Sequence, residues 1–100
     1  MGVKLCVSTQ GYAIFKCPGC GYNHHIRVKI DGQALLPPPI WDWNGSEVMP
    51  TILPSINFQT ADLDGIDVHC HSFVKDGKIQ FLSDCTHALK NQTVEIPDWV

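Results

Sequence analysis

The sequence has few basic residues. Lys and Arg number 7 against 10 Asp and Glu in 100 residues, which gives a net charge of −3. The basic residues are scattered along the chain and form no cluster. Because domains that bind nucleic acids carry an excess of Lys and Arg on one face, we do not expect a nucleic-acid partner.

Long hydrophobic runs are also missing. The longest apolar stretch, 34–41, is interrupted by prolines and is far too short to span a bilayer. Residues 1–15 do not resemble a signal peptide, because Thr9, Gln10 and Gly11 interrupt the apolar core that one needs. We therefore expect no membrane association and a cytoplasmic location, which is the host cytosol if the protein is encoded by a phage. In that reducing compartment the 5 cysteines are expected to be metal ligands or core residues and not disulfides.

No stretch keeps apolar residues at helical spacing over several turns, and no internal repeat is present. The length favours one domain over residues 1–100. We predict a mainly β fold of short antiparallel strands, with one short helix over 85–90 that Ser83 or Asp84 would cap.

Two hairpins stand out in the pattern of apolar residues. The first joins 12–15 to 25–30 and carries Cys17-Pro18-Gly19-Cys20 at its tip. The second joins 68–75 to 78–82 and folds at Asp76-Gly77, a pair typical of tight turns. Between them, Pro54 limits the extended segment 51–58 to a sheet edge or a bulge.

The two cysteines at the first hairpin tip predict a metal site. Zinc prefers four Cys or His ligands in a tetrahedron, so the chain must supply two more. In the second hairpin, regular pairing puts Cys70 and Cys85 on one face as diagonal neighbours, about 7–8 Å apart at the backbone. We therefore predict a structural zinc site like the knuckle of a zinc ribbon. The predicted ligands are Cys17, Cys20, Cys70 and Cys85, with His71, His87 and His24 as alternatives.

Trp41 and Trp43 are the second feature with a functional interpretation. Tryptophan is enriched in binding hot spots, so these two side chains are candidates for a partner-binding surface. Ser55 and Ser72 lack any nucleophile-elbow pattern, such as Gly-x-Ser-x-Gly.

Several motifs together resemble those of a group of short phage and prophage proteins that are often labelled "ammonia monooxygenase". The shared motifs are Cys17-Pro-Gly-Cys20, Trp41-Asp-Trp43-Asn-Gly45, Pro50-Thr-Ile-Leu-Pro54-Ser-Ile56, Cys70-His-Ser-Phe-Val-Lys-Asp-Gly-Lys-Ile79 and Asp84-Cys-Thr-His-Ala-Leu89. The membrane enzyme of that name needs spanning helices and copper ligands, and we do not expect its activity here.

This group is in turn similar to a wider family of unknown function. The resemblance implies metal ligands at Cys17, Cys20, Cys70 and His71, which competes with the choice of Cys85. Relatives in the wider family lie near genes for bacterial ubiquitin-like conjugation, which points to partners in such a system.

A metal site with four protein ligands leaves no position for a substrate. We therefore predict a small non-enzymatic, zinc-stabilised binding module, an accessory protein of a phage or mobile element that engages a host or phage protein. The alternative is a metal-dependent hydrolase with a zinc-bound water and with His87 or Asp84 as the base.

Overall fold

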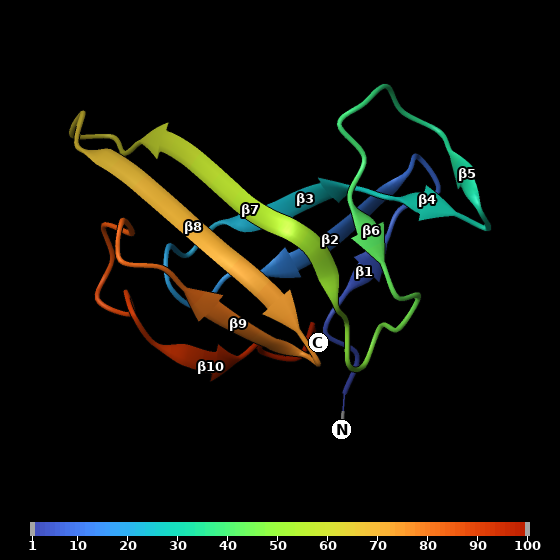
Figure 1. Ribbon diagram of the computed structural model, residues 1–100. Coiled ribbons are helices and arrows are strands. Elements are labelled where there is room, and N and C mark those ends of the chain that lie inside the picture. Colours follow the sequence, from blue (N-terminus) through green and yellow to red (C-terminus); the bar gives the residue numbers. More distant parts are fainter. Residues whose placement is uncertain (1, 100) are drawn as a thin grey trace.

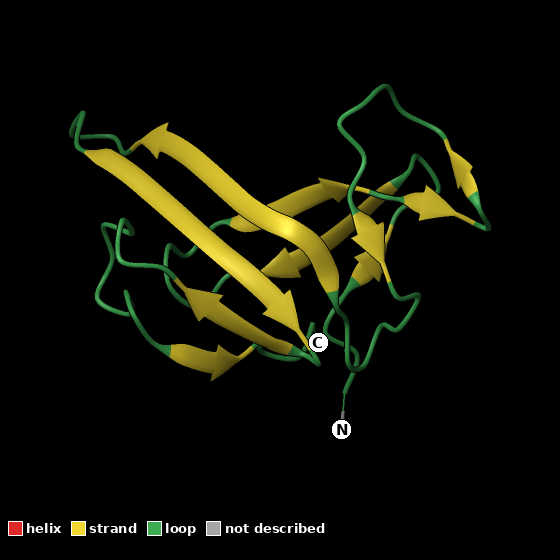
Figure 2. Cartoon of the chain, in the orientation of Figure 1, coloured by secondary structure: helices red, strands yellow, loops and turns green. Residues whose placement is uncertain are grey.

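The computed structural model describes residues 2–99, and their backbone consists of strands, turns and loops (Figures 1 and 2). The strands are β1 (Cys6–Val7), β2 (Tyr12–Lys16), β3 (Asn23–Arg27), β4 (Lys29–Ile30), β5 (Gln33–Ala34), β6 (Asp42–Trp43), β7 (Ile52–Ala61), β8 (Asp67–Lys75), β9 (Lys78–Phe81) and β10 (Thr93–Glu95). The mainly β fold that the sequence predicts is confirmed.

The strands form two principal antiparallel sheets. One has three strands in the order β1-β2-β3, and the other has five in the order β10-β9-β8-β7-β6. Strands β4 and β5 pair as a separate ribbon, at the right of Figure 1. The long strands β7 and β8 run side by side and supply the largest pairing in the molecule (Figure 1).

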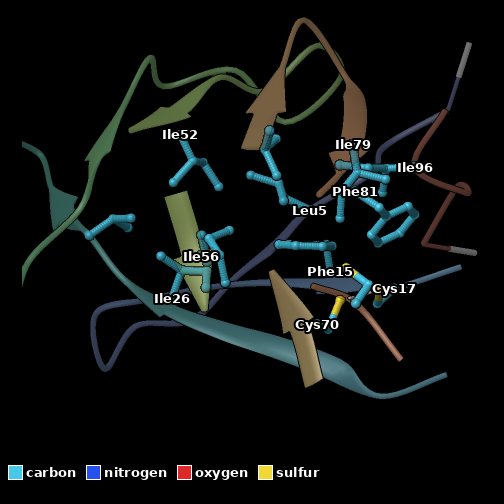
Figure 3. Close-up of a cluster of buried hydrophobic side chains, with 14 residues drawn as sticks. Leu5, Phe15, Cys17, Ile26, Ile52, Ile56, Cys70, Ile79, Phe81 and Ile96 are labelled. Carbon is cyan, nitrogen blue, oxygen red and sulfur yellow. Dashed lines mark hydrogen bonds between the residues drawn. The ribbon is translucent and has the colours of Figure 1, made fainter. Parts of the chain in front are cut away.

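The core lies between these two sheets, because alternate residues of each strand turn inward. Strand β8 shows the rule: Cys70, Ser72 and Val74 are fully buried, whereas His71 and Phe73 lie on the outer face. The other buried residues of the strands include Ala13, Phe15, Ile26, Ile52, Ile56, Ile79 and Phe81. Figure 3 shows Cys17 and Cys70 at one end of this core with their sulfur atoms close together.

Both predicted hairpins are present. In the first, Lys16 pairs with Asn23 and the two cysteines of the tip follow β2 directly. In the second, Lys75 pairs with Lys78 across a two-residue turn. Asp76 and Gly77 have φ values of 51° and 79°, the left-handed conformation that the Asp-Gly pair predicts.

A bulge interrupts β7 at Pro54. Ile52 pairs with Val74 and Ile56 pairs with Ser72, so that residues 53–55 lie opposite Phe73 alone. The prediction that Pro54 occupies an edge or a bulge is therefore confirmed, since proline has no N–H to donate to the ladder.

The regular register of the second hairpin holds from Lys75 to Ser72 and then changes. Continued pairing would put Asp84 opposite His69, but Thr86 takes that place: its N–H donates to the His69 carbonyl at 2.9 Å. The chain between Phe81 and Thr86 therefore loops outward and then rejoins β8.

The predicted helix over 85–90 is wrong. The backbone hydrogen bonds within this segment join residues three apart and not four apart, so they close single turns and do not form the repeating ladder of an α-helix. What remains is a set of turns closed by single hydrogen bonds, such as Lys90 N to His87 O at 3.3 Å. Residues 2–99 contain no helix long and apolar enough to cross a membrane.

Candidate catalytic triad and metal centre

Three polar side chains meet on the outer face of the five-stranded sheet. The Ser55 Oγ lies 3.1 Å from the His71 Nε2, and the His71 Nδ1 lies 3.0 Å from the Asp84 Oδ2. Ser55 and His71 are half-buried, whereas Asp84 is exposed. The imidazole thus connects a hydroxyl on one side to a carboxylate on the other.

Irregular backbone brings these three side chains together. Ser55 is the last residue of the bulge in β7, and its carbonyl accepts a hydrogen bond from the Trp41 Nε1 at 3.1 Å. The Leu82 N–H donates to the His71 carbonyl at 2.9 Å. Further along the chain, the Thr86 N–H is hydrogen-bonded to β8. The loop between Leu82 and Thr86 extends outward and carries Asp84 to the edge of the His71 imidazole.

The electrostatics of the group favour an ionised Asp84. Partial desolvation raises the pKa of this carboxyl, but the hydrogen bond with His71 and the nearby His69 ring outweigh that effect and hold the pKa below its usual range. An ionised carboxylate only accepts hydrogen bonds, so the His71 Nδ1 must carry a proton. In the neutral ring the Nε2 then has a free lone pair that faces the Ser55 hydroxyl.

This arrangement is the geometry of nucleophilic acyl transfer. A serine hydroxyl is a weak nucleophile until an adjacent base takes its proton, and that base works best when a third group orients it. Ser55, His71 and Asp84 have the distances that these three roles require. Ser72, the other serine considered from the sequence, is fully buried and cannot reach a substrate.

On the inner face, four further side chains form a cluster that can hold one metal ion. The Cys17, Cys20 and Cys70 Sγ atoms and one ring nitrogen of His24 all lie within 4.8 Å of one another. Cys17 and Cys20 follow β2, His24 lies on β3, and Cys70 comes from β8 in the opposite sheet. The cluster therefore joins the two sheets.

The spacing of these atoms fits a tetrahedral site. Ligands bound to zinc at ordinary bond lengths lie about 3.8 Å apart for two sulfurs and about 3.6 Å for sulfur and nitrogen. The Cys17 Sγ lies 3.7 Å from the Cys70 Sγ, and the Cys20 Sγ lies 3.5 Å from the His24 Nε2. His24 is held by Phe58, which it meets edge-on at 4.8 Å between ring centroids.

The protonation states of these groups are strongly coupled. Hydrogen bonds with the Cys17 and Cys70 thiols lower the pKa of Cys20, and hydrogen bonds with Cys17 and Cys20 raise the pKa of Cys70. Burial lowers the pKa of His24, but hydrogen bonds and charge from Cys17 and Cys20 outweigh it and raise the value to about 9. A bound cation would relieve this competition by displacing the protons.

The structure brings three of the four predicted ligands, Cys17, Cys20 and Cys70, to this cluster. Cys85 lies in a second group with Cys70 and His87, whose ligand atoms are also within 4.8 Å of one another. The two groups share Cys70. The predicted set with Cys85 and the set with His24 thus differ in one ligand, and which set binds the ion stays a prediction.

The two remaining predicted residues, Trp41 and Trp43, are half-buried and pack against the core. Their indole N–H groups donate to the backbone carbonyls of Ser55 and Ser46. Their use as a partner-binding surface stays a prediction.

Sequence reasoning missed the triad, although one signal for it was available. Regular pairing about Asp76-Gly77 puts Asp84 on the same face of the hairpin as His71. No local pattern indicates Ser55, because the bulge that presents it is formed by pairing with a strand distant in the sequence.

The outer-face site has the geometry of the Ser-His-Asp class of triads. The family described as bacterial ubiquitination-like system serine protease (BubE) matches residues 2–82 of this chain. The chain belongs to the BubE family. Ser55 and His71 fall within the match, and Asp84 lies just past its end.

No curated protein and no solved structure matches the chain. The family match does not support the name "ammonia monooxygenase", and it agrees with the link to ubiquitin-like conjugation that the sequence motifs implied.

Proposed function

We propose that this protein is a serine protease of a bacterial ubiquitination-like system, with Ser55 as nucleophile, His71 as general base and Asp84 as the residue that orients the base. The observation that carries the proposal is the continuous chain of contacts, 3.1 Å from Ser55 to His71 and 3.0 Å from His71 to Asp84. The family's description supports the same reaction class.

In the proposed reaction, the Ser55 Oγ attacks the carbonyl carbon of the scissile bond while its proton passes to the His71 Nε2. The imidazolium is stabilised by the Asp84 carboxylate. It then gives the proton to the departing amine, which leaves an acyl group on Ser55. Water, activated by the same imidazole, releases the acyl group and restores the serine.

This proposal departs from the non-enzymatic binding module expected from the sequence. That expectation assumed that a filled metal site leaves no room for chemistry. The triad lies on the opposite face of the sheet from the cysteines, so a fully ligated metal and a catalytic site are compatible. A host or phage protein as partner then becomes a proposed protein substrate.

We also propose that the inner cluster holds a structural zinc ion through Cys17, Cys20, His24 and Cys70. Three thiols and one imidazole are soft and borderline donors, which favour zinc over calcium or magnesium. Four protein ligands close the coordination shell, so the ion supplies stability and not a reactive water. A zinc-dependent hydrolysis with His87 or Asp84 as base is therefore the weaker alternative.

A fluorophosphonate probe, which phosphonylates activated serines, tests the protease proposal without knowledge of the substrate. We expect one probe per chain by intact mass spectrometry and a modified peptide that contains Ser55. Ser55→Ala and His71→Ala should each abolish labelling.

Ser72→Ala is the matched control, because it makes the same chemical change at a fully buried serine. It should label as the wild type does. If the wild type resists the probe, or if labelling persists in Ser55→Ala, the proposed triad is wrong.

A further inference from the structure

The proposed reaction places a negative charge on the carbonyl oxygen of the substrate, and the triad itself offers no donor to that oxygen. Enzymes of this class supply hydrogen-bond donors there, from backbone N–H groups or from side-chain amides. The donor must lie beside the nucleophile, on the same face of the sheet. Asn57 meets both conditions.

Asn57 follows Ser55 by two residues on β7, past the bulge, where pairing with β8 is regular again. Residues two apart in a strand share a face, and their Cα atoms are about 7 Å apart. Asn57 is also the direct cross-strand partner of His71. Its side chain therefore lies beside both the nucleophile and the base.

The orientation of the Asn57 amide is fixed by His69. The Asn57 Oδ1 lies 2.7 Å from the His69 Nε2, and because a carbonyl oxygen only accepts, His69 is the donor. His69 is itself anchored through its backbone N–H, which donates to the Thr86 Oγ1 at 2.9 Å. With the oxygen held on that side, the Asn57 Nδ2 turns its two N–H groups away from His69, and no group within residues 2–99 accepts them.

A groove of about 230 Å³ between β3 and β7 runs past this amide. Its walls include Asn57, Trp41 and His25. Trp41 is also the residue whose indole N–H donates to the backbone carbonyl of Ser55, so one wall of the groove is in contact with the residue that carries the nucleophile. The Trp41 Nε1–H is already used in that bond and does not compete for the role.

We propose that the Asn57 side-chain amide donates a hydrogen bond to the oxyanion that forms when Ser55 attacks the substrate carbonyl, and that His69 is a positioning residue for this amide; the inference rests on the proposed function. In the step, the Oγ–C bond forms, the hydroxyl proton goes to the His71 Nε2, and the carbonyl π electrons move to the oxygen. When the intermediate collapses, those electrons re-form the C=O bond, and the leaving group departs with the proton from His71.

The test uses the full chain with two probes, a fluorophosphonate and p-nitrophenyl acetate, whose ester carbonyl forms the same kind of oxyanion. Asn57→Ala should lower kcat for the ester by about 10²- to 10³-fold with little change in KM, the effect of removing one oxyanion donor elsewhere. The rate of phosphonylation should fall in parallel. His69→Ala should lower kcat less, since the Asn57 amide remains but is no longer held.

Gln59→Ala is the matched control, because Gln59 is the next outward residue of β7 and pairs with His69. It should retain kcat within twofold. Asn57→Asp serves as a second variant of the same shape as Asn57; it should lose kcat as severely as Asn57→Ala, since a carboxylate cannot donate to the oxyanion.

The outcomes separate the two claims. A wild type that reacts through Ser55 while Asn57→Ala and Asn57→Asp match Gln59→Ala overturns the oxyanion role and leaves the triad standing. A change confined to KM also overturns it, because a residue that only binds substrate does not act in the transition state. A wild type inert to both probes overturns the triad and the oxyanion role together.

Discussion

Cys70 and His71 are consecutive residues of β8, and their side chains leave opposite faces of the sheet. The Cys70 thiol is buried in the cluster that could hold a metal ion, while the His71 ring faces Ser55. Asp84 and Cys85 are also consecutive residues with side chains on opposite sides: Asp84 contacts the His71 ring, and Cys85 is buried. The two pairs are also joined directly, because the His71 N–H donates to the Cys85 Sγ at 3.3 Å and the Cys85 thiol donates to the His71 carbonyl at 3.2 Å.

Because Cys70 is a proposed metal ligand and directly precedes His71 in β8, we predict that loss of the metal disables the triad. Removing a structural ion from a small domain costs at least about 3 kcal/mol, which corresponds to a fall in Tm of roughly 12–24 °C for a chain of this size. We expect chelation to lower Tm by that amount and to abolish fluorophosphonate labelling even below the new Tm. Differential scanning calorimetry and labelling measure the two effects. Full labelling of a protein shown to be metal-free would contradict this prediction.

The two candidate ligand sets differ in which single substitution should remove the metal ion. His24 belongs only to the first cluster and Cys85 only to the second, so His24→Ala should lose the ion and Cys85→Ala should keep it. Elemental analysis of the purified variants measures zinc per chain. Cys6→Ala, at a half-buried cysteine of β1 outside both clusters, is the control. The reverse result would establish the set of Cys17, Cys20, Cys70 and Cys85 that the sequence predicts.

Replacing Asp84 tests the third member of the triad. In Asp84→Asn the amide can donate to the His71 Nδ1, which favours the tautomer with its proton on Nε2, where it cannot accept from Ser55. We expect kcat for p-nitrophenyl acetate to fall by about 10⁴-fold with the fold intact. Asp64→Asn, in the exposed loop between β7 and β8, should leave kcat unchanged. A comparable loss in both variants would show that the effect is not specific to the triad.

Much of the fold follows from local signals. The Asp76-Gly77 pair sets the second hairpin through its left-handed φ values, and Pro54 marks the bulge because it lacks an N–H. The expectation that Cys17 and Cys20 lie together follows from their spacing in the sequence alone. Each of these features depends on residues that are close in the sequence.

The triad and the fourth member of the metal cluster depend on longer-range pairing. Ser55 is presented by a mismatch between β7 and β8, and Asp84 by a change of register beyond Phe81. His24 joins the first cluster because β3 packs against β8 of the other sheet, whereas regular hairpin pairing favours Cys85. The alternation of side chains between two faces predicts neighbours only while one pairing register continues along a hairpin. The local sequence does not indicate where that register changes.

The lowered pKa of Asp84 predicts that this carboxyl does not limit activity at mildly acid pH. A carboxyl with a lowered pKa stays ionised to lower pH than usual, so Asp84 should not gain a proton in the range where the enzyme acts. Protonation of Asp84 should therefore cause no loss of activity near the ordinary pKa of a carboxyl. The contribution of the pair to stability is present above the ordinary pKa of a carboxyl and is lost only as pH falls through the lowered value.

The labelling rate of the wild type against pH measures this, over the range in which zinc content is constant. A loss of labelling centred at the ordinary pKa of a carboxyl would contradict the lowered pKa of Asp84.

Ser72 offers a test of stability that is separate from catalysis. Its hydroxyl is fully buried between the sheets, and no group within residues 2–99 forms a hydrogen bond with it. An unsatisfied buried hydroxyl costs about 1–3 kcal/mol, and deleting one oxygen leaves only a small void. We therefore expect Ser72→Ala to raise the free energy of unfolding by about 1 kcal/mol and Tm by roughly 4–8 °C, with unchanged labelling of Ser55. Urea unfolding measures the change, and a loss of stability would mean that the hydroxyl is satisfied and that this part of the core is packed differently.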